Sequence, residues 1–495
     1  MDELKVFHRK RLTALFALSA TLMMTGCNIG GTENKSETEK ATIKVMYYDE
    51  RSFFDQFGML YSALHPEVEF QIVTQQYNNS EPGKDLEAEM TKFIDENKPD
   101  ILFLSSEQLT KYGNDGKLLE LDSMVEDKKF NKETFIPGLI DYFKELGGGK
   151  LYGLTPNYYS QVLYYNKDLF QKYSVDLPTD KMSWEQMLQL AQRFPTTGSK
   201  EERVYGLSLG YNSDPYQFGS MIGASSNLNF VNPTTAQVTI NTDAWKKTFD
   251  LAFKALKSGA LHTQDPSAPS ATSSYEDYLL QDPFVAGKVA MKLEGNYLID
   301  QIKQAQQQVK DKAIKNWDMV TVPVNPQAPD SSPNVGLSQF FAVSSQSANA
   351  DAAKEFLQYV MSDEYARVTS KLNRGNLPVR TTYYKDDEGH NMKAFYTLKP
   401  TESTIYKNYD KLPSDFLMQF MTIAQQELKS AFDGQITLDD ALNNAQTKGQ
   451  AALLQGQAQQ KDKEAAAPAS GQASAQSSVQ AGVQAEASSS SAEAK

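Results

Sequence analysis

The chain has 495 residues with 49 Lys or Arg and 62 Asp or Glu, so its formal net charge is −13. This acidic balance argues against nucleic acid as a partner, because phosphates need a basic surface. The single cysteine excludes an internal disulfide and a thiolate metal site. Between polar terminal stretches lie about four hundred residues, too many for one ordinary core, so we expect two domains.

The N-terminal segment has the features of a secretory signal peptide. Basic residues open it, and an apolar run over 12–24 follows, shorter than the ~20 residues of a membrane-spanning helix. The run leads into Thr25-Gly26-Cys27, which resembles a bacterial lipobox, where a peptidase cuts before a cysteine that carries a diacylglyceryl group. We expect 1–26 to be a signal peptide and Cys27 to be lipidated. The alternative is an ordinary signal peptide with an unmodified Cys27.

Two further segments lack the apolar residues of a core. Residues 27–40 are polar and charged, which indicates a flexible stalk. Residues 455–495 consist mainly of Ala, Gln, Ser and Gly, which indicates a disordered tail because such residues bury too little surface to offset their ordering entropy.

Strands and helices alternate from residue 42 onward. Apolar runs predict strands at 42–48, 68–73 and 100–104, and helical spacing predicts helices at 52–64 and 85–95. The continuous run Asp-Ile-Leu-Phe-Leu at 100–104 is typical of a parallel sheet. This alternation predicts a doubly wound, mostly parallel sheet.

The pattern restarts after the glycines at 147–149. The later strands are expected at 150–154, 162–165, 204–209, 289–293, 317–322 and 340–343. The later helices are expected at 167–173, 184–194, 244–256, 275–286, 299–309 and 350–361, with the remainder to about 454 helical.

One motif suggests catalysis. The stretch Gly206-Leu207-Ser208-Leu209-Gly210 fits the G-x-S-x-G of serine hydrolases. That motif needs a sharp strand-to-helix turn, whereas this stretch alternates like a continuing strand, and Asp214-Pro215 does not favour an immediate helix. We therefore expect no enzyme. An exported hydrolase using Ser208 stays an alternative, which a turnover assay decides.

Other motifs give no cofactor or metal site. The glycines before Lys150 miss the P-loop spacing, because Leu151 takes the Ser/Thr place. The four histidines are scattered without a ligand pattern. The acidic run 386–388 lacks EF-hand spacing and is expected to form a solvated loop. We expect no cofactor and no metal.

Polar and aromatic side chains follow several predicted strands. Open α/β sheets bind ligands beyond the carboxyl ends of their strands. Carboxylates and amides suit sugar hydroxyls, and a flat Tyr face suits the C–H face of a pyranose. Tyr158 and Tyr297 are candidates for stacking, and Arg51 and Arg374 for hydroxyls or a uronate carboxylate. The complete candidate ligand-binding set is Asp49, Glu50, Arg51, Glu107, Tyr158, Tyr159, Asn296, Tyr297, Gln339 and Arg374.

Several stretches occur in an order that resembles a known family. They are NKPDILFL (97–104), GKLLELD (116–122), GKLYGLTP (149–156), VLYYNKDLF (162–170), MSWEQMLQLA (182–191), FVAGKVAM (284–291), EGNY (294–297), AAKEFLQYVMSDE (352–364) and GNLPVR (375–380). Together they resemble the extracellular solute-binding proteins of ABC importers, in the cluster that includes maltose- and oligosaccharide-binding proteins. The resemblance covers about residues 42–450.

The resemblance implies two α/β lobes of the periplasmic-binding-protein type, joined by hinge crossings, with ligand in an interlobe cleft and a C-terminal helical extension. Lobe I would comprise 41–155 plus 323–362, and lobe II 156–322 plus 363–454. Crossings would fall near 155–156, 322–323 and 352–363. The Gly-Asn-aromatic segment carries a sugar-stacking aromatic in many relatives, and here that aromatic is Tyr297, where Trp is common.

The expected function is that of a lipid-anchored receptor on the outer face of the membrane of a single-membrane bacterium. It would capture an oligosaccharide as a monomer and deliver it to an ABC permease. A binding protein for a peptide, polyamine or metal, a sensor and a structural surface lipoprotein remain alternatives.

Overall fold

A computed structural model describes most of the chain between residues 41 and 466. The described residues are 41–74, 86–199, 202–210, 214–232, 234–263, 274–337, 339–372, 376–386, 388–403, 405, 409 and 412–466. The expected signal peptide, the stalk, Cys27, Arg374 and the tail beyond 466 lie outside them.

The first sheet has the strand order β2-β1-β3-β14-β4. Its strands are β1 (Ala41–Met46), β2 (Val68–Val73), β3 (Ile101–Ser105), β4 (Gly153–Leu154) and β14 (Gln339–Val343). β1 pairs in parallel with β2 and β3, whereas β14 runs antiparallel to β3 and β4. Two of the four strand pairs in this sheet are therefore parallel, as expected. The other two are antiparallel because β14 comes from later in the chain, after the second lobe.

Helices surround this first sheet. They are α1 (Glu50–Phe53), α2 (Met59–Leu64), α3 (Leu86–Asn97), α4 (Ser106–Asn114), α5 (Asp122–Glu126), α6 (Leu139–Leu146), α13 (Ala350–Val360) and α14 (Asp363–Thr369). The Phe356 ring of α13 packs 5.0 Å from that of Phe70 in β2. Helix α14 belongs here too, because the Tyr365 hydroxyl donates to the Gln56 carbonyl at 3.0 Å. We therefore propose that lobe I extends past residue 362; the remaining expected boundaries stay predictions.

The second sheet has the order β11-β5-β10-β6-β9. Its strands are β5 (Asn157–Asn166), β6 (Tyr205–Ser208), β9 (Leu261–His262), β10 (Val289–Gly295) and β11 (Trp317–Thr321). β6 is parallel to β9 and β10, while β5 is antiparallel to β10 and β11. The helices are α7 (Lys167–Lys172), α8 (Trp184–Ala191), α9 (Pro215–Ser225), α10 (Asp243–Lys257), α11 (Tyr275–Leu279), α12 (Tyr297–Val309), α15 (Phe416–Phe432) and α16 (Leu438–Ala466).

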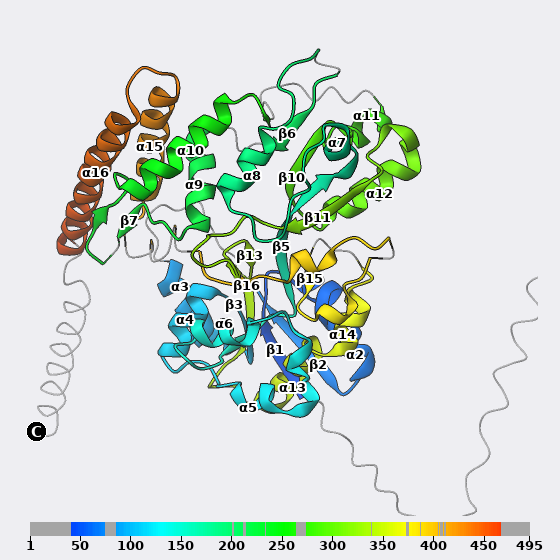
Figure 1. The fold of residues 1–495 in the computed structure, drawn as a ribbon. Helices are drawn as coiled ribbons and strands as arrows, with labels where there is room; N and C mark the ends of the chain where they lie inside the picture. Colours follow the sequence, from blue (N-terminus) through cyan, green and yellow to red (C-terminus); the bar gives the residue numbers. More distant parts are fainter. Residues whose placement is uncertain are drawn as a thin grey trace, which may run out of the picture.

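The lobes are joined at β5, which runs from one to the other (Figure 1). Its first residues pair with β13 (Val335–Gly336) and β15 (Leu377–Pro378), two short strands from later in the chain. The chain crosses between the lobes just after 156 and after β11; the expected hinge positions near 155–156 and 322–323 stay predictions. A third crossing lies at β15 and not within 352–363, because α13 and α14 pack on the first lobe.

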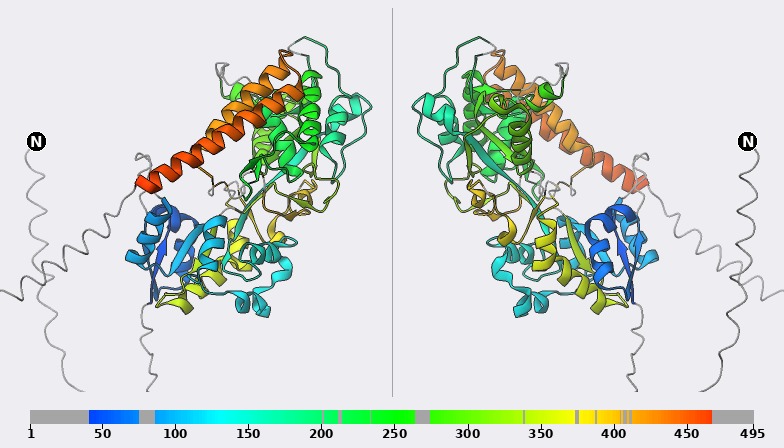
Figure 2. Two further views of the ribbon diagram at one scale, coloured as in Figure 1. Left: turned by 90° about the vertical axis from the view of Figure 1, so that its left-hand side faces the viewer. Right: turned by 90° about the vertical axis from the view of Figure 1, so that its right-hand side faces the viewer.

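The C-terminal helices α15 and α16 form a pair along the flank of the second lobe (Figure 2). Their apolar side chains share a core with α9 and α10, in which Trp245 stacks on Phe230 at 4.2 Å. α16 continues to Ala466, so the disorder expected from 455 is wrong over 455–466; Ala, Gln, Lys and Glu in that stretch are good helix formers.

Two glutamines of α16 bond to the backbone of β8 (Gln237–Val238), which forms a hairpin with β7 (Val231–Asn232). The Gln450 Oε1 accepts from the Val238 N–H at 2.9 Å, and its Nε2 donates to the Ala236 carbonyl at 2.9 Å. The Gln446 amide donates to the Val238 carbonyl and accepts from the Asn241 N–H. Each side-chain amide therefore accepts from one backbone N–H and donates to one backbone carbonyl, as a neighbouring strand would.

Three other sequence predictions need correction. α9 begins directly at Pro215, because the Asp214 carboxylate caps the N–H groups of Tyr216 and Gln217 and proline fits the first helical turn. α11 ends at Leu279 instead of 286. The described residues of 376–403 are mostly irregular, and the expected helix is replaced there by two short 3-10 helices, Thr381–Tyr383 and Met392–Phe395. Within the part of the chain that the structure describes, no helix combines the length and apolar character needed to cross a bilayer.

Candidate functional site

Side chains at the carboxyl ends of β1 and β3 form what we call the first-lobe edge, with Tyr48, Asp49, Glu50, Arg51, Glu107 and Gln339 as members. Asp49 caps α1, its Oδ1 accepting from the Ser52 N–H at 2.8 Å, and this bond lowers the pKa of the carboxyl. Arg51 is exposed and lies 3.7 Å from Asp55. These groups thus stand at the surface with partners on their own helix.

The neighbouring strands complete this edge. Ser105 ends β3 and begins α4 through a capping box with Gln108, which places Glu107 in the exposed first turn. Gln339 starts β14 and pairs with Ser105. The structure therefore brings Gln339 beside the residues that follow β3, although more than two hundred positions separate them in sequence.

The second-lobe edge lies at the carboxyl end of β10, where Gly295 pairs with Gln161 of β5. Tyr159 packs closely on glycine: a Cβ at Gly295 would lie 2.9 Å from its Cε2, and one at Gly336 would lie 3.4 Å from its Cβ. Its hydroxyl accepts from the Gln161 amide at 3.3 Å, and burial raises its pKa. Tyr159 is thus held where the crossing strands meet.

Asn296 and Tyr297 follow β10 and differ in exposure. Asn296 is buried, shares a side-chain hydrogen bond with Tyr384, and its Oδ1 has no hydrogen-bond partner among the described residues. Tyr297 opens α12 with 45% of its surface exposed, and its hydroxyl hydrogen-bonds to Glu294. Burial, followed by this bond, raises the pKa of Tyr297. Tyr297 therefore offers an anchored ring with an accessible face.

Beneath Tyr297 lies an ion cluster that the sequence analysis missed. The Lys292 ammonium hydrogen-bonds to Asp282 and lies 3.3 Å from a Glu294 oxygen. The side chains of Lys292, Asp282 and Glu294 are only 11%, 13% and 15% exposed. The spacing of Lys292 and Glu294, two residues apart and so on one face of a strand, could have indicated their pairing; Asp282 gave no such signal.

Two predicted site residues are not placed at either edge. Tyr158 is 3% exposed, pairs with Leu377 and packs in the core, so its ring has no face for a ligand, and we leave it out of the proposed site. Arg374 lies outside the described residues. Among the described residues, no three His, Cys, Asp or Glu side chains gather as a metal site.

Ser208 and His262 are neighbours in register on β6 and β9. The Ser208 hydroxyl, however, lies 3.5 Å from the Gly210 N–H, and Asp282 is bonded to Lys292. A serine, a histidine and an aspartate are thus close in the fold, but these contacts are not those of a hydrolase triad, in which serine and aspartate both bond to the histidine.

His262 makes stability depend on pH. Burial lowers its pKa, with Asp282 and Lys292 as the charged groups that act on it. The unfolded state, with a pKa of about 6.5, therefore binds the proton first, and stability present above that pH is lost as the pH falls below it. We expect urea midpoints to fall as pH drops below about 6.5, and His262→Gln to flatten this slope. His65→Gln at a partly exposed position is the control, and an unchanged slope in His262→Gln would contradict the prediction.

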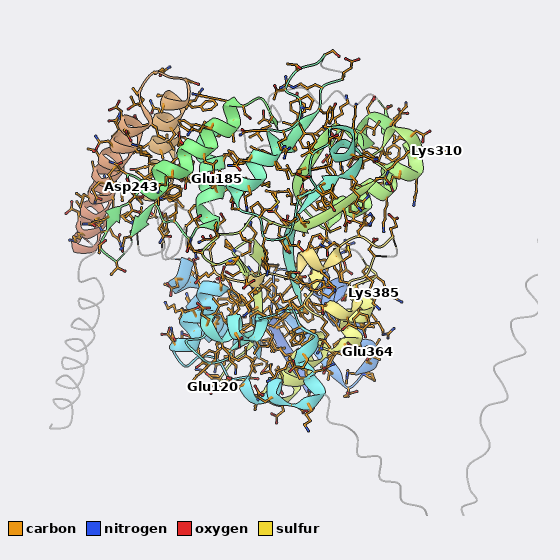
Figure 3. The ribbon with its side chains drawn as sticks, viewed as in Figure 1. Glu120, Glu185, Asp243, Lys310, Glu364 and Lys385 are labelled. Carbon is orange, nitrogen blue, oxygen red and sulfur yellow. The ribbon has the colours of Figure 1, made fainter. Side chains whose placement is uncertain are left out.

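Several charged side chains outside these edges lie on the outer surface, as Glu120 and Glu364 do on the first lobe and Glu185 and Lys310 on the second (Figure 3). Comparison with known proteins gives the family. Residues 61–397 match the model of the bacterial extracellular solute-binding proteins. The chain belongs to this family.

This solute-binding protein has distant relatives. It is 21% identical over 337 residues to an sn-glycerol-3-phosphate-binding periplasmic protein of Rhizobium meliloti, covering 66% of this chain and 73% of the relative. It is 22% identical over 364 residues to an arabinooligosaccharide-binding protein of Bacillus subtilis, covering 72% and 77%. A sugar transporter from Rhizobium etli in an open conformation matches with a TM-score of 0.56 and 21% identity, covering 83% of this chain and 99% of that one.

The two-lobed α/β fold expected of a solute-binding protein is thereby confirmed. The family match spans residues 61–397, so it includes the second-lobe edge and, of the first-lobe edge, Glu107 and Gln339. It excludes residues 48–51 of the first-lobe edge and the helices α15 and α16.

Proposed function

We propose that this solute-binding protein captures a saccharide between its lobes outside the cell and delivers it to an ABC permease. The observation that carries this proposal is Tyr297, an anchored and partly exposed ring at the carboxyl end of β10, with Glu294 as a hydroxyl acceptor beside it. Asp49, Glu50, Glu107 and Gln339 supply further acceptors from the first lobe. Stacking and hydroxyl bonding together are how proteins hold sugar rings.

The mechanism is a shift in the balance between open and closed forms. A ligand favours closure only if it contacts both edges in the closed form and one in the open form. The paired segments β5, β13 and β15 are the connections about which the lobes would move. No bond of the ligand is broken in this scheme, and the permease would recognise the closed form.

Membrane attachment through Cys27 is also part of the proposal, because it follows a basic and apolar leader and precedes a polar stretch. Two acyl chains would give stable anchoring. In cells, the wild type would fractionate with membranes, whereas Cys27→Ser would appear in the soluble fraction; membrane-bound Cys27→Ser would refute this tether.

A thermal-shift screen of the purified protein tests the ligand class. A saccharide at one hundred times its Kd would stabilise the folded state by about 2.7 kcal/mol. The panel would hold mono- and oligosaccharides, with peptides and polyamines as competing classes, and chromatography would check that the bound molecule is recovered unchanged. Stabilisation by peptides or polyamines alone, or a chemically altered ligand, would reject the saccharide receptor.

The two relatives leave the charge of the ligand open, since one is a binding protein for a phosphorylated polyol and the other for a neutral oligosaccharide.

A further inference from the structure

The ion cluster of the second-lobe edge indicates which ligand charge the site would accept. Four side chains form a connected series from the interior to the surface: Asp282, Lys292, Glu294 and Tyr297. Lys292 contacts both carboxylates, and Glu294 also accepts from the Gly295 N–H at 3.0 Å and bonds to the Tyr297 hydroxyl. Glu294 is therefore fixed by three partners, and the ring that it holds is fixed with it.

The cluster has a net negative charge. Two carboxylates surround one ammonium, and the three side chains are almost fully shielded from solvent, so the unbalanced charge is weakly screened. The first-lobe edge adds Asp49, Glu50 and Glu107, while its described cation, Arg51, lies beside Asp55. Among the described residues of the two edges, acid therefore exceeds base.

A phosphate monoester needs cationic or N–H donors that are not already occupied by carboxylates. Lys292 does not meet this need, because its ammonium is buried between Asp282 and Glu294. A carboxylate offers about four lone-pair sites, and the three partners of Glu294 leave it one of them. A sugar hydroxyl or an ammonium group could therefore still donate to Glu294, while the C–H face of the ring lies on Tyr297.

We propose that Lys292 is a positioning residue that fixes Glu294 and Tyr297, and that the resulting negative edge selects uncharged or amine-bearing saccharides over phosphorylated ones. This inference rests on the proposed function and extends it to the charge of the substrate.

Calorimetry on the full protein tests the selection with matched probes: glucose, glucosamine, glucose 6-phosphate, maltotriose, arabinotriose and sn-glycerol 3-phosphate. We expect at least one uncharged or amine-bearing saccharide to bind at least tenfold more tightly than either phosphate. A phosphate that binds as tightly as the best neutral probe overturns the inference but leaves a solute receptor standing. Silence from every probe overturns the inference and the proposed function together.

Variants test the residues. Glu294→Gln keeps the size and an acceptor but removes the charge, so the ratio of the phosphate Kd to the neutral Kd should fall about tenfold. Glu185→Gln removes the same charge from α8 on the outer surface and should leave the ratio unchanged (Figure 3). If the ratio is unchanged in Glu294→Gln as well, the edge does not set the selection.

The positioning role needs its own readout. Lys292→Met leaves two buried carboxylates without a cation and is at risk of misfolding, so Lys292→Arg is tested beside it. Lys292→Arg should bind the neutral probe within about threefold of wild type and keep the Kd ratio. Folded Lys292→Met, checked by circular dichroism, should bind that probe at least tenfold more weakly; wild-type binding by this variant would refute positioning by Lys292.

Discussion

Trp245→Ala should lower the free energy of unfolding by about 3–5 kcal/mol, the usual cost of removing a large aromatic from a core. Trp245 is 1% exposed and lies between Phe230 and Phe249, with ring centroids 4.2 and 5.4 Å away. Its indole N–H donates to the Asn229 carbonyl at 2.9 Å, so the substitution also removes one of two hydrogen bonds to that carbonyl, which keeps the Thr239 hydroxyl as a donor at 2.6 Å. The loss should loosen α15 and α16, which share this core.

Urea unfolding followed by far-UV circular dichroism measures the effect. Met418→Ala is the matched control, since Met418 lies on α15 with 68% of its surface exposed and should change stability by less than about 0.5 kcal/mol. A loss below about 1 kcal/mol in Trp245→Ala would show that the helical pair does not depend on this core.

Tyr297→Ala should weaken binding of the best saccharide from the thermal-shift panel by about thirtyfold, corresponding to about 2 kcal/mol. The ring supplies the apolar face on which the sugar would lie, and alanine removes it while the helix start remains. Calorimetry gives the Kd, and unfolding midpoints without ligand should stay close to wild type because the ring is 45% exposed.

Tyr297→Phe separates stacking from anchoring. It retains the ring but loses the hydroxyl bond to Glu294, so we expect a loss of about fivefold or less. Equal Kd values for wild type and Tyr297→Ala would remove Tyr297 from the proposed site.

The local patterns predicted most regular elements, and the misses have physical reasons. The apolar run at 100–104 became β3, and the amphipathic pattern at 244–256 became α10. α9 is absent from the predicted elements because proline usually breaks a helix, whereas it suits the first turn behind an aspartate cap. β13 and β15 are two residues long and exist only through pairing with β5, which no local pattern can reveal.

The sequence predicted the location of those candidate site residues that directly follow a strand. Asp49, Glu107 and Tyr297 all follow strands as expected. Tyr158 failed this rule because β5 begins at Asn157, so Tyr158 lies inside a strand and faces the core. The contact of Lys292 with Asp282 depends on how the turn after α11 folds against β10, and the sequence carries no periodic signal for it.

The bonding of Gln446 and Gln450 to β8 has a geometric basis. Four residues of helix rise by about 6.0 Å, and two residues of strand advance by about 6.7 Å, so glutamines one turn apart fall opposite successive peptide groups. The helix rise per turn and the strand advance per two residues differ by about 0.7 Å, so such pairing can continue for only a few turns. One turn further on either side, α16 has Leu442 and Leu454 in place of glutamine. A helix can thus occupy the hydrogen-bonding groups of an edge strand through its side chains, so that a second molecule cannot pair with that edge.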